Sequence, residues 1–535
     1  MRSTRRKRMK NSLILGLSLS LVACNCSEGG GNAAAGAATP KALDSLLAAM
    51  PSKDAGLVVA VHDVKGALEG LNVQVDRLAG AIDDPAKIRA AVTDRFGFSP
   101  FDVAGWAAAG VDTSGGVGVW FGGEGKVEKW SALVMVAVAD QAKLLETVKR
   151  LAKREGAMDV GEKVAHEGGE WYPFQRTLGQ RTTEDGGLFI RGGQAVLTTG
   201  NKDVVARLGK DSPRMSADAA FKEMVAQLPG KGQAVIYGSR KLSISQLDAA
   251  EAVPGLEGDG WAAAVSATPQ KMEVHSASKS DGKALEELKK LIPEPLPVPA
   301  IPAKALAAWQ QSTDAKAIIA LFAQTPQFAR ALNQLETGLK GMGLDLHDDV
   351  LKPFGTTFSA WLGVGSDATS PFLLLGTAFA GIDIAGGEPQ KFVDTVKKVL
   401  ETAGAPVPGL TGVPNGFDFK HQLGTLTIRA EKEGNRLSAR FGEAPKETLA
   451  ATRPAAKGLA LSKDQASAVW VDFQGLAKAA KVGGSLAGQS PLAAIVDKVA
   501  AAIGQYDHLM VTSGQKGKFQ MSHGALVMKA PAAGK

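Results

Sequence analysis

The two halves of this chain repeat one another in sequence, and this internal repeat constrains the fold more than any other feature. Residues 143–150 (KLLETVKR) match residues 391–398 (KFVDTVKK), and both segments have the apolar spacing of an amphipathic helix. The pair Gly97-Phe98 precedes the first segment, and Gly343-Leu344 precedes the second in the corresponding place. Because the matches keep their order in both halves, we expect two copies of one structural unit.

A shorter pattern of strand, polar residue and helix also recurs. It is clearest in VVAVHDVKGALEGL from Val58 and in SAVWVDFQGLAKAA from Ser467. Apolar residues first alternate, as on a pleated strand, and then follow the helical period. Strands are also expected at 132–138 and 372–379, before the matched helices. Since hairpins join many of these strands, the pattern predicts an α+β fold of two homologous lobes, each a largely antiparallel sheet covered by helices.

Proline and small residues mark the predicted boundaries. Five prolines between Leu291 and Ala303 remove backbone donors and favour extended geometry, which indicates a stiff linker. The predicted parts are a signal peptide at 1–23, a lipidated N-terminus with a flexible Gly/Ala tether at 24–40, one lobe at 41–290, the linker at 291–303, a second lobe at 304–527 and a disordered tail at 528–535.

The first 26 residues have the order of a bacterial export signal. Six basic residues precede a short apolar run from Leu13 to Val22. At about 1.5 Å per residue the run reaches about 15 Å, half of a hydrocarbon core of about 30 Å, so it is too short to span a membrane. The segment Leu21-Val22-Ala23-Cys24 resembles the lipobox of bacterial lipoproteins. The resemblance implies cleavage between Ala23 and Cys24 and acylation of Cys24; an ordinary cleaved signal with incidental cysteines is the alternative.

An acylated Cys24 implies attachment to the bacterial cell envelope. Two or three acyl chains hold a protein stably on a membrane, whereas one chain holds it only reversibly. Asn25 is not Asp, and under the enterobacterial sorting rule this favours the outer membrane. We therefore expect the membrane to be one partner, contacted through the N-terminal acyl chains.

Charge and cysteine content exclude several functions. Removal of the signal takes away six basic residues and lowers the formal net charge from +7 to +1, so the mature chain lacks the basic excess that binds nucleic acid. Both cysteines, Cys24 and Cys26, lie at the processing site. The body therefore has no disulfide, no cysteine-bound metal and no cysteine nucleophile.

The body also resembles an uncharacterised family of secreted and membrane-anchored bacterial proteins. That family is known only as a domain of unknown function, and its members repeat strand-helix units like those from Val58 and Ser467. The resemblance covers most of residues 41–525 and implies no catalytic residues.

One cluster combines several potential metal ligands: Asp345, His347, Asp348 and Asp349. Their oxygen and nitrogen atoms could bind Ca²⁺ or Zn²⁺ if the turn curled around an ion. The spacing of a calcium-binding loop is absent, however. A turn that caps the following helix is the favoured interpretation.

Two further pairs, His62-Asp63 and Asp507-His508, could each provide a base oriented by a carboxylate. Helix capping by Asp63 is a sufficient explanation of the first pair. The sequence contains neither a Gly-x-Ser-x-Gly elbow nor a Gly-x₄-Gly-Lys-Ser/Thr phosphate loop. These patterns do not indicate a hydrolase or an ATPase.

Trp171, Tyr172 and Phe174 form an aromatic cluster in a stretch that is otherwise polar. Most tryptophans are core anchors, but this cluster has less apolar sequence around it, so we expect partial exposure and a possible ligand platform.

Together these observations predict a non-catalytic envelope lipoprotein, a binding or structural module for an unknown envelope protein or apolar ligand, with no cofactor. The alternatives are a metal-dependent envelope enzyme that uses residues 345–349 and a periplasmic carrier of an apolar ligand.

Overall fold

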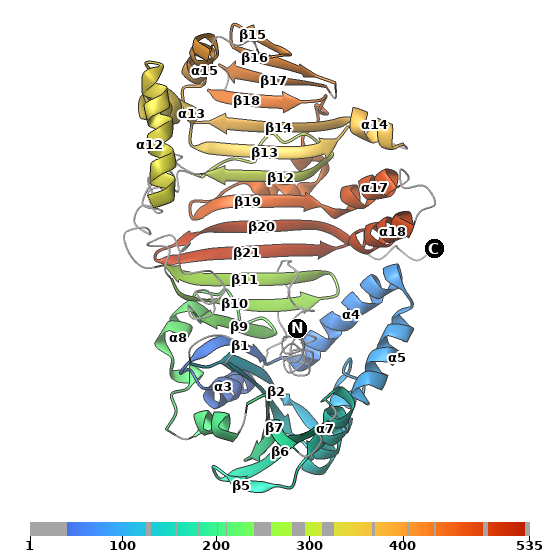
Figure 1. Ribbon diagram of the computed structural model, residues 1–535. Coiled ribbons are helices and arrows are strands. Elements are labelled where there is room, and N and C mark those ends of the chain that lie inside the picture. Colours follow the sequence, from blue (N-terminus) through green and yellow to red (C-terminus); the bar gives the residue numbers. More distant parts are fainter. Residues whose placement is uncertain are drawn as a thin grey trace. The chain divides into compact units, whose positions relative to one another are not determined.

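The computed structural model describes residues 40–535, except 125–129, 157, 179–180, 201, 210, 240–257, 281–294, 313–325, 366–369, 404–406, 423, 433–434, 485–490 and 530–535. The predicted signal peptide with Ala23, the predicted lipidation site Cys24 and the predicted tether before Pro40 lie outside the described residues. The fold is mixed α+β with a large antiparallel sheet (Figure 1). The chain divides into two compact units, unit 1 with Met1–Ala252 and Gly258–Lys279, and unit 2 with Val253–Glu257 and Ser280–Lys535.

Unit 1 combines strands with helices, and it contains the strand and the following helix that the pattern from Val58 predicts. Its strands are β1 (Ala55–Val61), β2 (Val111–Gly122), β3 (Ser131–Val138), β4 (Asp159–Val160), β5 (Val164–His166), β6 (Gly169–Leu178), β7 (Arg181–Arg191), β8 (Gln194–Thr198), β9 (Ala234–Ser239), β10 (Gly258–Thr268) and β11 (Lys271–Ser280). Its helices are α3 (Pro40–Ala49), α4 (Val64–Ile82), α5 (Pro85–Phe96), α6 (Val103–Ala108), α7 (Gln141–Gly156), η2 (Lys202–Leu208), η3 (Met215–Ala217) and α8 (Ala219–Val225).

The strands of unit 1 pair antiparallel in the order β10–β9–β1–β2–β3–β8–β7–β6–β5. One face carries alternating valines such as Val59, Val119 and Val134. Leu68 of α4 and Leu144 of α7 pack on this face in the main core of the unit. Burial of these apolar side chains is what holds the helices on the sheet.

Unit 2 has its own set of elements. Its strands are β12 (Ala305–Ser312), β13 (Thr357–Val364), β14 (Ala378–Ala385), β15 (Leu410–Val413), β16 (Gly416–His421), β17 (Gly424–Glu431), β18 (Arg436–Phe441), β19 (Gln465–Asp472), β20 (Tyr506–Lys516) and β21 (Phe519–Met528). Its helices are α12 (Pro326–Gly341), η4 (Leu346–Leu351), α13 (Lys352–Phe354), α14 (Pro371–Gly376), α15 (Pro389–Ala403), α16 (Leu449–Thr452), η5 (Pro454–Leu459), α17 (Phe473–Gly484) and α18 (Pro491–Ile503).

The strand order of unit 2 is the same as that of unit 1. The antiparallel pairs run β20–β19–β12–β13–β14–β18–β17–β16–β15, so β12 takes the place of β1 and β19 the place of β9. The matched helices α7 and α15 each follow the corresponding strand, β3 or β14. The described strands of the two units are therefore paired in a common order.

The matched sequences also make the same contact in each unit. Arg150 of α7 donates from Nη2 to the carbonyl oxygen of Gly97 at 3.0 Å. Lys398 of α15 donates from Nζ to the carbonyl oxygen of Gly343, also at 3.0 Å. Both glycines have a positive φ, 70° and 67°, which glycine adopts without steric cost. A cation therefore binds the carbonyl of a left-handed glycine in both places.

The described part of the predicted linker, 295–303, packs on unit 2. Leu296 and Leu461 exchange backbone hydrogen bonds of 2.9 and 3.0 Å, and Ile301 is buried in a core cluster with Trp361 and Trp470. The prolines thus keep the segment extended, and its apolar residues attach it to the second unit.

Two expectations near element boundaries are wrong. Residues 372–379 are not one strand, because α14 ends at Gly376 and β14 begins at Ala378. Pro371 suits the first turn of a helix, and the Ser370 hydroxyl accepts a hydrogen bond from the Leu373 amide at 3.3 Å. Strand β21 includes Met528, the first residue of the predicted tail, while 530–535 lie outside the described residues.

Candidate functional site

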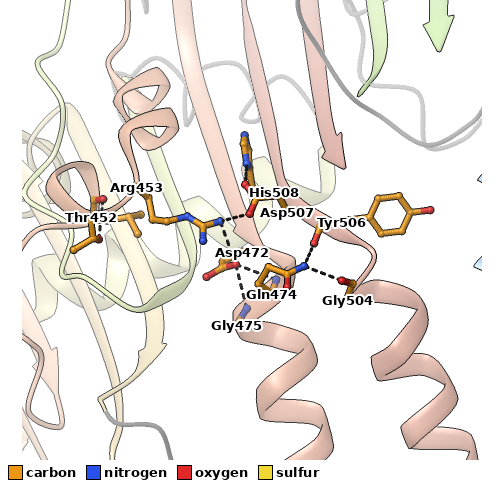
Figure 2. Close-up of polar contacts among 10 residues, drawn as sticks. Thr452, Arg453, Asp472, Gln474, Gly475, Gly504, Tyr506, Asp507 and His508 are labelled. Carbon is orange, nitrogen blue, oxygen red and sulfur yellow. Dashed lines mark hydrogen bonds and ion pairs between the residues drawn. The ribbon is translucent and has the colours of Figure 1, made fainter. Parts of the chain in front are cut away.

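Four titratable residues of unit 2 meet at the ends of neighbouring strands, and of the polar groups in the described part of the chain they most resemble a catalytic site (Figure 2). Asp472 is the last residue of β19, and Asp507 and His508 lie at the start of β20. Arg453 follows α16 directly. The antiparallel pairing of β19 with β20 places Asp472 opposite His508.

Short polar contacts link these groups. His508 Nδ1 lies 2.6 Å from Asp507 Oδ2, and Arg453 Nη2 lies 3.0 Å from Asp507 Oδ1 and 3.6 Å from Asp472 Oδ1. Asp472 Oδ1 also accepts hydrogen bonds from the amides of Gln474 at 3.0 Å and Gly475 at 3.1 Å. Arg453 therefore joins two carboxylates, one of which caps α17.

Burial sets the charge of His508. Its side chain is largely buried and stacks on the Trp470 ring with centroids 4.3 Å apart. Desolvation lowers the pKa of His508, and this outweighs the opposing effect of the hydrogen bond to Asp507. Near neutral pH the imidazole is uncharged and donates from Nδ1 to Asp507, which leaves the lone pair on Nε2.

A neutral imidazole oriented by a carboxylate is one half of a general-base site. The other half is a nucleophile or a bound water, and no hydroxyl among the described residues donates a hydrogen bond to His508. Gln474 completes the cluster by donating from Nε2 to the carbonyl oxygens of Gly504, at 2.9 Å, and Tyr506. The contacts join α16, β19, α17 and β20, so the arrangement stabilises the fold.

The sequence indicated part of this cluster and missed the rest. It placed Asp507 beside His508, but it did not identify Arg453 or Asp472 as their partners. One available signal was the spacing Asp472-x-x-Gly475, which repeats that of Asp63-x-x-Gly66.

The predicted helix cap at Asp63 is confirmed. Asp63 Oδ1 accepts a hydrogen bond from the amide of Gly66 at 2.9 Å, at the start of α4. His62 is buried at the end of β1, and burial lowers its pKa. The pair is thus a capping carboxylate beside a neutral core histidine.

Two carboxylates of the potential metal cluster, those of Asp345 and Asp349, bind backbone amides. Asp345 Oδ1 accepts from the amides of His347 at 2.8 Å and Asp348 at 2.9 Å, and these hydrogen bonds lower the pKa of Asp345. Asp349 Oδ2 accepts from the Asp345 amide at 2.9 Å, and its Oδ1 lies 3.4 Å from Lys391 Nζ. The favoured interpretation, a turn that caps the next helix, is confirmed in η4.

The expected exposure of the aromatic cluster is wrong. Trp171, Tyr172 and Phe174 are all buried, with 2%, 7% and 3% of their surface exposed. They lie on β6, which pairs with β7, and Tyr172 and Phe174 belong to the main core of unit 1. The polar residues around them in sequence do not exclude this, because strand pairing brings distant apolar residues to their ring faces.

Glu170, next to this cluster, is a carboxylate whose pKa is strongly lowered. Hydrogen bonds from Lys163, Tyr172 and Gln141, each 2.7 Å long, lower the pKa of Glu170 to about 2. The carboxylate is accessible to solvent. The network is therefore a set of surface contacts that joins Lys163, just before β5, to β6 and α7.

Comparisons with known proteins give no family. No protein-family model and no curated protein matches the chain. Two solved structures, titled as crystal forms IV and III of TP0453, are 12% identical to it, with TM-scores of 0.24 and 0.25. The matches cover 44% and 47% of this chain and 79% and 87% of those chains. Among the described helices, none combines the length and apolar character needed to cross a membrane.

Proposed function

We propose that the protein is a non-catalytic lipoprotein of the bacterial cell envelope, built from two duplicated lobes that serve as a binding or structural module. The main support for a non-catalytic role is the cluster of Arg453, Asp472, Asp507 and His508. Its carboxylates cap a helix and bind an arginine, and its histidine stacks on a buried tryptophan. Such contacts stabilise a fold, and they support a structural role for these groups.

The common strand order supports duplication of the two lobes. Independent evolution of the same nine-strand order would not also reproduce the cation bound to the carbonyl of Gly97 in one unit and of Gly343 in the other. We place the lobes at 41–290 and 304–527.

The lipid anchor rests on the sequence from Leu21 to Cys24. Acylation of Cys24 would attach the mature chain to a bilayer, with the outer membrane favoured by Asn25. The partners would be the membrane and an unknown envelope protein or apolar ligand.

An interior carrier of apolar ligands receives less support. Between the sheet and helices α6 and α7 of unit 1 lies a cavity of about 60 Å³, lined by residues such as Trp106, Leu144 and Val148. For comparison, an engineered apolar cavity of about 150 Å³ holds benzene. This cavity is thus too small for an acyl chain without rearrangement.

Acylation provides the direct test. The full chain is expressed in a Gram-negative host, and membrane fractions are analysed by intact mass. The wild type should lose residues 1–23 and gain the mass of two or three acyl chains. Cys24→Ser should abolish both changes, whereas the matched control Cys26→Ser should leave them intact. An unmodified wild-type N-terminus in the soluble fraction would contradict the proposal.

A further inference from the structure

Unit 1 contains an open cleft between the end of α3, the β7–β8 hairpin and the segment after η2. Its volume is about 330 Å³, within the range of small-molecule sites, about 300–1,000 Å³. The lining residues that matter for binding are Met135, Phe189, Arg191, Gln194, Val196 and Arg214.

Two arginines converge in this cleft. Arg191 donates from Nη2 to the carbonyl oxygen of Leu208 at 2.7 Å, and Arg214 donates from Nη2 to the same oxygen at 2.9 Å. Arg191 also donates to the carbonyl oxygen of Glu167 at 3.1 Å. Backbone oxygens hold the two guanidinium groups next to each other in spite of their like charges.

Among the described residues, no carboxylate forms an ion pair with Arg191 or Arg214. Other arginines of unit 1 do have such partners: Arg207 lies 3.2 Å from Asp54, and Arg176 lies 3.3 Å from Asp185. Desolvation and the charge of Arg191 lower the pKa of Arg214. The cleft thus has two positive charges that the protein does not neutralise.

The two arginines have different capacities for a ligand. Arg214 uses Nη1 for the carbonyl oxygens of Ala49 and Arg207 and Nη2 for those of Leu208 and Gly209, so it contributes mainly charge. Arg191 makes two of the five hydrogen bonds that a guanidinium can donate. Its remaining donors are available for an anion.

The lining combines polar groups with apolar side chains. Met135 and Val196 are buried on adjacent strands β3 and β8, and Phe189 lies with its ring centroid 5.5 Å from Arg191 Cζ. An anion bound at Arg191 would therefore have apolar side chains beside it, which favours a ligand with a hydrocarbon part.

We propose that this cleft binds an amphiphilic anion, a carboxylate or phosphate group on a short apolar chain, with the anionic group at Arg191 and the chain against Met135, Phe189 and Val196. The site lies wholly in unit 1 and does not depend on the lipid anchor, so it stands or fails separately from the proposed function.

The test is calorimetric titration of the full chain as purified in detergent, acylated or not, with a detergent blank as the reference. The probes are octanoate, octanol and inorganic phosphate, which separate the anionic group from the chain. Octanoate should bind wild type more tightly than either of the others. Arg191→Gln should weaken octanoate by at least about tenfold, since a charge-assisted hydrogen bond is lost.

Two further variants serve as a control and as an independent test of the cleft. Arg150→Gln is the matched control, because Arg150 also donates to a backbone carbonyl but lies on α7 outside the cleft, and it should leave octanoate binding unchanged. Gln194→Glu places a carboxylate at the exposed rim of the cleft and should weaken octanoate even if Arg191→Gln does not fold. Octanoate binding that is absent, or equal in wild type and both cleft variants, would overturn the proposal. If inorganic phosphate bound as tightly as octanoate, the proposed contact between the ligand's apolar chain and the cleft would be wrong.

Discussion

Replacing Trp171 with alanine tests the burial that sequence reasoning did not anticipate. The ring is 2% exposed, and a Cβ at Gly187 would lie 2.3 Å from a ring carbon, so the indole occupies the space left by that glycine on β7. A buried aromatic side chain covers about 150–250 Å². At about 25 cal/mol per Å² this corresponds to about 4–6 kcal/mol as an upper value. Measured losses for such truncations are about 3–5 kcal/mol.

We therefore expect Trp171→Ala to lower the free energy of unfolding by about 3–5 kcal/mol. The assay is urea unfolding followed by far-UV circular dichroism, with the slope m compared between variants. Phe372→Ala is the control, because Phe372 is 79% exposed and its truncation should cost less than about 1 kcal/mol. A loss below about 1 kcal/mol for Trp171→Ala would refute the burial, because an exposed ring is the only arrangement consistent with it.

Three further outcomes follow from the site. Asp63→Ala should lower unfolding stability by about 1 kcal/mol in the same urea assay, because the amide of Gly66 loses its cap; an unchanged midpoint would contradict the capping role. Burial lowers the folded pKa of His508 below 6.5, so the unfolded chain gains its proton first as the pH falls. Stability should therefore be constant above about pH 6.5 and decrease below it, and His508→Gln should reduce that slope; an equal slope in both proteins would rule out this assignment. His347→Ala should leave the melting temperature and its response to EDTA unchanged, since the neighbouring carboxylates bind amides; stoichiometric metal lost in this variant would support the alternative enzyme.

Local sequence was sufficient where one short segment contains the whole interaction. Asp63 and Gly66 are three residues apart, as are Asp345 and Asp348, so the spacing alone identifies an N-terminal cap. The internal repeat could also be recognised from sequence, because alternating and helical spacings of apolar residues follow one another in a similar order in both halves.

Contacts between distant residues could not be derived in the same way. Trp171 is buried by β7, and Arg453 reaches Asp507 across 54 positions of the chain. The cleft likewise joins Ala49 to Arg214, 165 residues apart. Which residues meet at such separations depends on strand pairing and loop closure, not on any local pattern.

The amino-acid sequence by itself therefore determined the absence of cysteines from the body, the helix caps and much of the order of strands and helices, since each follows from neighbouring residues. Tertiary structure alone decided that the aromatic cluster is core, that His508 is neutral and locked beside Arg453, and that Arg191 and Arg214 share one carbonyl. Burial and charge proximity are properties of the assembled sheet, and they arise only when segments far apart in the chain pack together.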